Sequence, residues 1–175
     1  YSISTLDQTK LGLLEKAGVI QILCRDTPFS VSLKNSKDDS ITVGISGQEY
    51  YPDIDSGNMD DFKVDTDCDL NILAVHGYLC TDRQHPDIRC TYCENILTDA
   101  DIILSGHYHH SFKYDGVDFS VYNPGSMMRI EQDEYNKTRI PQYGILEITL
   151  DDDGVINYEY GMHDFRIAEP SPRNV

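Results

Sequence analysis

The fold of this chain is decided at residues 102–109, which read Ile102-Ile103-Leu104-Ser105-Gly106-His107-Tyr108-His109. The apolar run predicts a strand that is buried on both faces, and the glycine marks its end. Side chains two positions apart point the same way in an extended backbone, so we expect His107 and His109 to converge while Tyr108 faces elsewhere. Two converging imidazoles supply half of the ligands of a transition-metal site.

A second apolar strand ends in the same way. Residues 71–75 lead directly into His76 and Gly77. Three histidines at two strand ends predict one shared cluster, because a rigid sheet holds the residues that follow its strands. Further along the chain, residues 123–126 have the composition of a turn, with a proline that fixes φ and a glycine that allows a positive φ.

These three elements, in this order, resemble the C-terminal half of the calcineurin-like metallophosphoesterase family, in particular phage and bacterial members related to repair exonucleases. The resemblance covers roughly residues 71–126. It implies an α/β fold, a metallophosphoesterase-type β-sandwich flanked by helices, of which this chain is the C-terminal portion of a four-layer α/β/β/α domain. Residues 1–167 are expected to belong to that single domain, and residues 168–175 to form a loose tail.

Family members also carry an Asp-x-His box, a Gly-Asp-x-x-Asp box and a Gly-Asn-His box followed by an acid. None of these boxes occurs here. We therefore expect the missing N-terminal half of the domain to supply the remaining metal ligands and the catalytic groups. This half is a required partner, and the chain alone is expected to be inactive.

The resemblance implies a role for each residue of the motifs. His76 and His107 would ligate one ion of a divalent metal pair and His109 the other, with Mn favoured over Fe, Ni or Zn. The intact enzyme would hydrolyse a phosphomonoester or phosphodiester by a metal-bound hydroxide. Its substrate would be a small phosphorylated molecule or a nucleic acid end. The residues expected to orient a ligand or to contact substrate are Asn123, Ser126, Arg129 and His110.

The composition limits the kinds of partner that the chain can bind. The chain has 14 basic and 30 acidic side chains, a formal charge of -16. Such a chain repels long nucleic acids and anionic membranes, so a phosphate substrate must be attracted by metal and not by a basic patch. No apolar run reaches the 18 or more residues of a membrane span. Five cysteines are an odd number in a chain that does not need disulfides, which favours a reducing cytoplasm.

Two other functions remain open at this point. Cys80, Cys90 and Cys93 could form a small structural zinc-binding module, although ordinary buried thiols explain their spacing better, because closed zinc sites usually show two paired motifs. Alternatively, the chain is a non-catalytic scaffold, or the partner half of a split domain, with the same fold. A chelator would separate these functions, because only the zinc module should lose its fold.

The periodicity of apolar residues predicts two helices, at residues 5–17 and 90–97. It also predicts strands that alternate with turn-rich segments. These strands are at residues 19–23, 29–33, 41–46, 70–75, 102–104, 117–122, 143–150 and 155–160, the last two forming a hairpin around residues 151–154.

Overall fold

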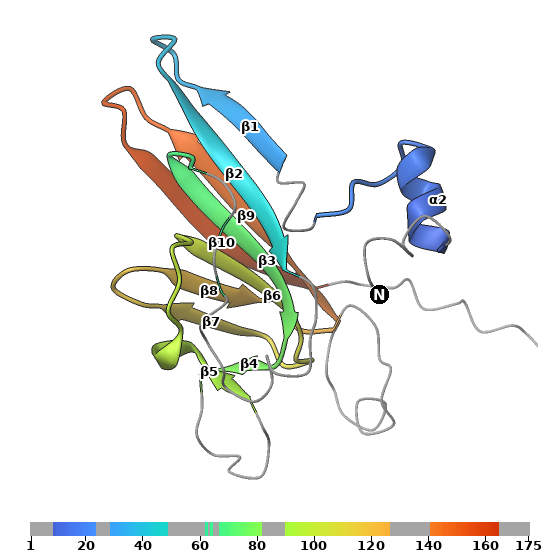
Figure 1. The fold of residues 1–175 in the computed structure, drawn as a ribbon. Coiled ribbons are helices and arrows are strands. Elements are labelled where there is room, and N and C mark those ends of the chain that lie inside the picture. Colours follow the sequence, from blue (N-terminus) through green and yellow to red (C-terminus); the bar gives the residue numbers. More distant parts are fainter. Residues whose placement is uncertain are drawn as a thin grey trace, which may run out of the picture.

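A six-stranded mixed sheet forms the centre of the computed structural model, which describes residues 9–23, 29–48, 62, 64, 67–81, 90–126 and 141–164 (Figure 1). Strands β2, β3, β6 and β8 run parallel, and antiparallel strands β1 and β7 form the two edges. The strands in spatial order are β1 (Phe29–Lys34), β2 (Ser40–Gln48), β3 (Leu70–Gly77), β6 (Ile102–His107), β8 (Ser120–Asn123) and β7 (Phe112–Asp115).

The central strands are apolar on both faces because both faces of the sheet are covered. On β3, Leu73 and Val75 face one core, and Leu70 and Ile72 face the other. Strand β6 divides in the same way, with Ile103 on the first side and Ile102 on the second. Continuous apolar runs are what a parallel strand covered on both faces requires. The strands predicted at 70–75 and 102–104 are thus confirmed, and each extends to a histidine-bearing end.

A long antiparallel ribbon covers one face of the sheet. It consists of β9 (Gln142–Leu150) and β10 (Ile156–Asp164), as the hairpin prediction required (Figure 1). Burial alternates along β9, which is the pattern of a strand with one face on a core and one face in solvent. In the connecting turn, Gly154 has a φ of +80°. Backbone hydrogen bonds, above all from Val155, lower the pKa of the Asp151 carboxyl from its usual value.

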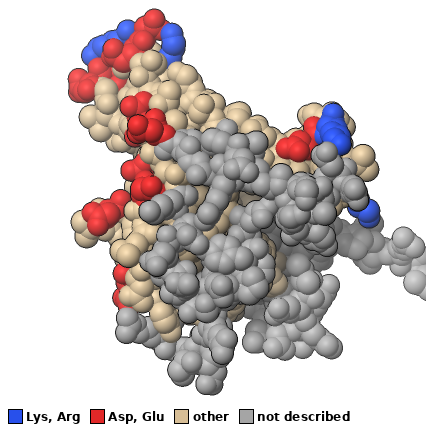
Figure 2. Space-filling view, viewed as in Figure 1, with Lys and Arg blue, Asp and Glu red and all other residues tan. Residues whose placement is uncertain are grey.

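The tips of two hairpins are joined. Asn35, in the turn between β1 and β2, donates to the Asp151 carbonyl at 2.9 Å. Ser36 donates to the Asp152 carboxylate, and Lys37 to the Asp152 carbonyl. Figure 2 shows the lysines and acids of both turns gathered at this end of the molecule. These bonds fix the ribbon over the sheet at the end opposite to the histidines.

The other face of the sheet is covered by short elements. They are β4 (Leu79–Cys80), β5 (Thr91–Tyr92) and the 3-10 turn η2 (Cys93–Asn95). Phe62, fully buried, completes this core and forms a bridge to Thr98. The helix predicted at 90–97 is therefore wrong. Residues 91 and 92 form strand β5, which pairs with β4. Cys93 and Ile96 are both buried by the single turn η2, and the backbone is extended again at Ile96.

The first helix is shorter than predicted. Helix α2 spans Lys10–Lys16, and the Thr9 side chain accepts a hydrogen bond from the amide of Gly12. The cap predicted at residues 5–8 lies outside the described residues. Gly18 ends the helix with a φ of +69°, as its position indicated. The strand predicted at 19–23 is wrong, because this segment is irregular and its Ile22 amide donates to the Glu15 carboxylate.

The chain is thus a mixed α/β protein in which most regular structure is strand. The described residues contain two short helical segments, α2 and η2, and so do not show helical layers outside both sheets. The tail predicted at 168–175 lies outside the described residues. None of the helices in the described ranges is both long and apolar enough to cross a membrane.

Candidate metal centre

His76 and His107 meet where β3 and β6 end side by side. In the parallel register His76 lies opposite Gly106, and Gly77 lies opposite His107. The two imidazole centroids are 4.9 Å apart, with their planes at 65°. Both side chains are exposed. A methyl group on Gly106 would stand 3.6 Å from His76 Nδ1, so the glycine leaves this flank of the imidazole open.

The backbone of His107 departs from the strand. Its φ is +81°, one of two positive values among the non-glycine residues that the structure describes. His76 and His107 are one residue out of register, so regular pleating would direct their side chains to opposite faces of the sheet. The turn at His107 accompanies the approach of the two rings. Non-glycine residues held in this region are strained, and such residues cluster at functional sites.

His109 lies two residues beyond the end of β6, and its side chain is half-buried. The alternation that predicted parallel His107 and His109 side chains does not apply, because the extended backbone ends at His107. Within the described ranges, no three His, Cys, Asp or Glu side chains lie close enough together to hold a metal ion. The structure brings His76 and His107 together, but it does not gather all three histidines into one three-ligand group.

The two rings that do meet fit a shared metal ion. Metal–imidazole bonds are about 2.1 Å long, and two cis ligands of one ion then have ring centroids roughly 5 Å apart. The observed separation of 4.9 Å lies in this range. The distance between the rings is thus compatible with two ligands of one ion, and further ligands would be needed to complete a coordination shell.

The loop at residues 123–126 anchors the segment that carries His109. Asn123 is fully buried, and its amide donates to the Tyr108 carbonyl at 3.1 Å. Its side-chain oxygen accepts from the Gly125 amide at 2.7 Å, and the Ser126 amide donates to the His109 carbonyl at 3.3 Å. Asn123 and Ser126 thus bond to the backbone of the loop that carries His109. These bonds go beyond the simple turn that the composition of residues 123–126 predicts.

Aromatic rings continue from the histidine pair along the loop. Tyr78 lies 5.9 Å from the His107 ring and 4.7 Å from the Tyr108 ring. Tyr108 in turn packs on His110 at 5.0 Å. Sequence reasoning missed Tyr78, although its position two residues after His76 was a usable signal. His110 is exposed at the end of this row of rings, and Arg129 lies outside the described residues.

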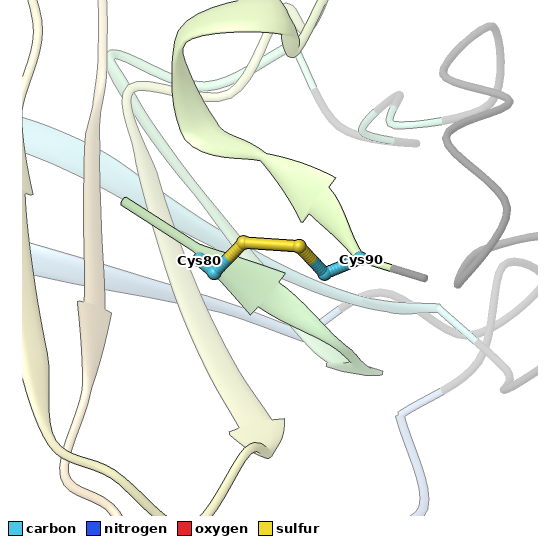
Figure 3. Close-up of a disulfide and its surroundings, with 2 residues drawn as sticks. All are labelled: Cys80 and Cys90. Carbon is cyan, nitrogen blue, oxygen red and sulfur yellow. A yellow bond between two sulfur atoms is a disulfide. The ribbon is translucent and has the colours of Figure 1, made fainter. Parts of the chain in front are cut away.

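Two cysteines of the proposed zinc module form a disulfide. Cys80 and Cys90 are bonded across the short pair β4 and β5 (Figure 3). Cys93 is a buried free thiol, and burial raises its pKa to about 12. A disulfide sulfur is not a thiolate ligand, so this structure leaves one of the three expected zinc ligands. The prediction of ordinary buried thiols is therefore wrong for Cys80 and Cys90 and confirmed for Cys93. The disulfide removes the cysteine-based argument for a reducing cytoplasm.

The sequence matches no model of a protein family, and no curated protein matches it. The resemblance to metallophosphoesterases therefore rests on the motifs within residues 71–126.

Proposed function

We propose that this chain is the C-terminal part of a metal-dependent phosphoesterase domain with the metallophosphoesterase β-sandwich fold. The observation that supports the proposal is the meeting of His76 and His107 at the ends of two adjacent parallel strands, with ring centroids 4.9 Å apart. In open α/β sheets, ligands bind in the crevice outside the carboxyl ends of the strands. The pair stands at such an end.

The histidines divide between two metal ions in this proposal. His76 and His107 ligate one divalent ion, and His109 ligates the other. Mn is the favoured metal. When bound, such a pair of ions activates water and neutralises the charge that develops on the phosphate oxygens.

Residues of this chain would hold the ligands in place before any metal binds. Asn123 fixes the Tyr108 carbonyl, and Ser126 fixes the His109 carbonyl, so the loop between β6 and β7 is held at two points. Tyr78 packs against His107 and limits the rotation of its ring. Outer contacts of this kind orient metal ligands and raise metal affinity. His110, exposed at the end of the aromatic row, would contact the substrate.

The charge of the chain limits the classes of substrate that it can bind. A formal charge of -16 disfavours long duplex DNA, which binds through neutralised phosphates. A small phosphoester, or a nucleic acid end, places few phosphates against this acidic surface. The metal pair then supplies the local positive potential.

In this proposal hydrolysis also requires the family's carboxylate ligands, whose boxes do not occur in this sequence. The family's three N-terminal boxes would come from the other half of the domain, and the chain alone would be inactive. A scaffold with the same fold would keep the histidine pair without needing it. Activity of the joined halves separates the two functions.

The test is Mn-stimulated hydrolysis of an aryl phosphodiester by the reconstituted domain. His107→Ala should lower turnover by at least 100-fold, because losing a metal ligand removes an ion that both binds and activates the substrate. His163→Ala is the matched control, since His163 lies on the ribbon and stacks on Tyr143. It should retain full turnover. Undiminished hydrolysis by the His107→Ala domain would exclude a ligand role for this residue.

A further inference from the structure

A row of aromatic rings continues from the histidine pair into the loop that follows β6. The aromatic row consists of Tyr78, Tyr108 and His110, and it begins next to His107. From His107 onward, successive ring centroids lie 5.9, 4.7 and 5.0 Å apart, which is the range of direct aromatic contact. The two tyrosines are half-buried, and His110 is exposed. An aromatic surface thus adjoins the place where a phosphate would bind.

The aromatic row is supported by the fold beneath it. Phe112 packs against the core that β4 and η2 cover, and its ring lies 6.3 Å from that of Tyr108. The Tyr108 carbonyl accepts a hydrogen bond from the Asn123 amide. Tyr78 directly precedes the two buried residues of β4. Rings that are already ordered lose little conformational freedom when a flat molecule stacks on them, so the row is suited to binding.

The exposed end of the row determines the shape of molecule that fits. Tyr78 contacts His107 and Tyr108, so this inner ring already has an aromatic neighbour at each step of the row. His110 is the exposed ring, and it follows His107 by three residues, so their Cα atoms are at most about 11 Å apart. An aromatic group bonded directly to the phosphate would stay beside His107. A group carried on a sugar can reach His110, and phosphate, sugar and base follow one another in this order in a nucleotide.

The charge of the two segments that carry the row suits an anionic substrate. Residues 70–81 and 102–114 contain no Asp or Glu, although the whole chain has 30. A phosphate is therefore repelled less by these segments than by the rest of the chain. Stacking of a base on an aromatic side chain needs no charge and no particular base, because every base has a π-face. The row therefore provides a base site that does not depend on a basic patch.

We propose that the aromatic row stacks the base of a nucleotide whose phosphoester is bound at the histidine pair. The inference rests on the proposed phosphoesterase function and narrows its substrate to a nucleotide, either free or at the end of a single strand. Tyr108 and His110 give specificity for a substrate that carries a base. The identity of the base is not distinguished, because stacking tolerates all of them.

The kinetic test compares two esters with the same leaving group, hydrolysed by the reconstituted domain with Mn. They are the p-nitrophenyl ester of thymidylate, which carries a base, and methyl p-nitrophenyl phosphate, which does not. Tyr108→Leu should lower kcat/KM for the thymidylate ester about tenfold, mainly by raising KM. The same variant should hydrolyse the methyl ester as the parent domain does, which also shows that it is folded. Tyr108→Phe keeps the ring and should retain both activities.

A binding test needs neither metal nor the N-terminal half. Adenosine added to the 175-residue chain should shift the NMR signals of the Tyr108 and His110 rings, whereas ribose should shift neither. His110→Ala should weaken adenosine binding, and His110→Phe should restore it. Tyr143→Leu is the matched control, because Tyr143 also stacks on a histidine, His163, at 5.4 Å, but on the ribbon. This variant should bind adenosine as the parent chain does.

The two tests separate the base site from the proposed function. If the reconstituted domain hydrolyses neither ester, the phosphoesterase proposal fails, and the nucleotide substrate fails with it. If the domain hydrolyses both esters but Tyr108→Leu affects them equally, or if adenosine shifts neither ring, only the base site is overturned. Competition against the thymidylate ester identifies the source of the base. Stronger inhibition by a short oligothymidylate than by thymidylate indicates a strand end, and the reverse indicates a free nucleotide.

Discussion

Replacing Gly125 by alanine tests whether the loop at 123–126 fixes the position of the histidine segment. Gly125 has a φ of +78°, which costs an L-residue about 1–2 kcal/mol. A methyl group there would also stand 2.8 Å from the His109 carbonyl oxygen and 3.0 Å from the Ser111 amide nitrogen. Both are backbone atoms that move only with the loop. We expect Gly125→Ala to lower the free energy of unfolding by about 2–4 kcal/mol, from backbone strain together with this steric overlap.

Gly154→Ala is a matched control for the strain alone. Gly154 has a similar φ of +80°, and a methyl group there would meet nothing within 4 Å. Gly154→Ala should lower the free energy of unfolding by about 1 kcal/mol. Urea unfolding measures both free energies. With a slope of about 2 kcal/mol/M, the urea midpoint should fall by about 1–2 M in Gly125→Ala and by about 0.5 M in Gly154→Ala. Equal losses in the two variants would refute the argument that Gly125 lies against the histidine loop.

Three further predictions concern other parts of the molecule. His107→Gly should unfold with a free energy about 1 kcal/mol higher than His107→Ala, because only glycine adopts a φ of +81° without strain; equal urea midpoints would contradict this. Burial raises the pKa of Tyr160 to about 12, so its neutral form stabilises the fold below pH 10 and this contribution should be lost as the pH rises from about 10 to 12. Tyr160→Phe should lose less stability over this range, and identical alkaline unfolding curves would argue against the shift. Reduction of the Cys80–Cys90 disulfide, separated by 10 residues, should lower the unfolding free energy by roughly 2–3 kcal/mol, and Cys80→Ser should show the same loss without reductant.

The sequence predicted the strands that place the candidate site. Continuous apolar runs, at residues 72–75 and 102–104, precede His76 and His107, and this pattern is typical of a parallel strand with both faces covered. The hairpin at residues 142–164 was predictable for a related reason, because Asp and Gly residues form its turn. The segment at 90–97 was not, since its apolar spacing suits one helical turn as well as a whole helix.

The details of the site depend on contacts that no local pattern records. The positive φ of His107 is not predicted by the local sequence pattern, so the alternation was wrongly continued through it to His109. The disulfide could not be assigned, because cysteine spacing does not fix connectivity. Gly47, Ala74 and Tyr160 line one hollow between the sheet and the ribbon, and these residues are far apart in the chain. Their meeting follows only from the sheet register and the position of the ribbon.

The most direct test of the account is whether His76 and His107 share one metal ion. Substoichiometric Mn²⁺ added to the chain should broaden the imidazole NMR signals of both residues to the same degree, and His76→Ala should abolish the broadening at His107. Binding should be weak, because the described residues supply only this pair near one point. Broadening confined to the acidic turns at residues 38–39 and 151–153, with both imidazoles unaffected, would contradict the proposed metal centre.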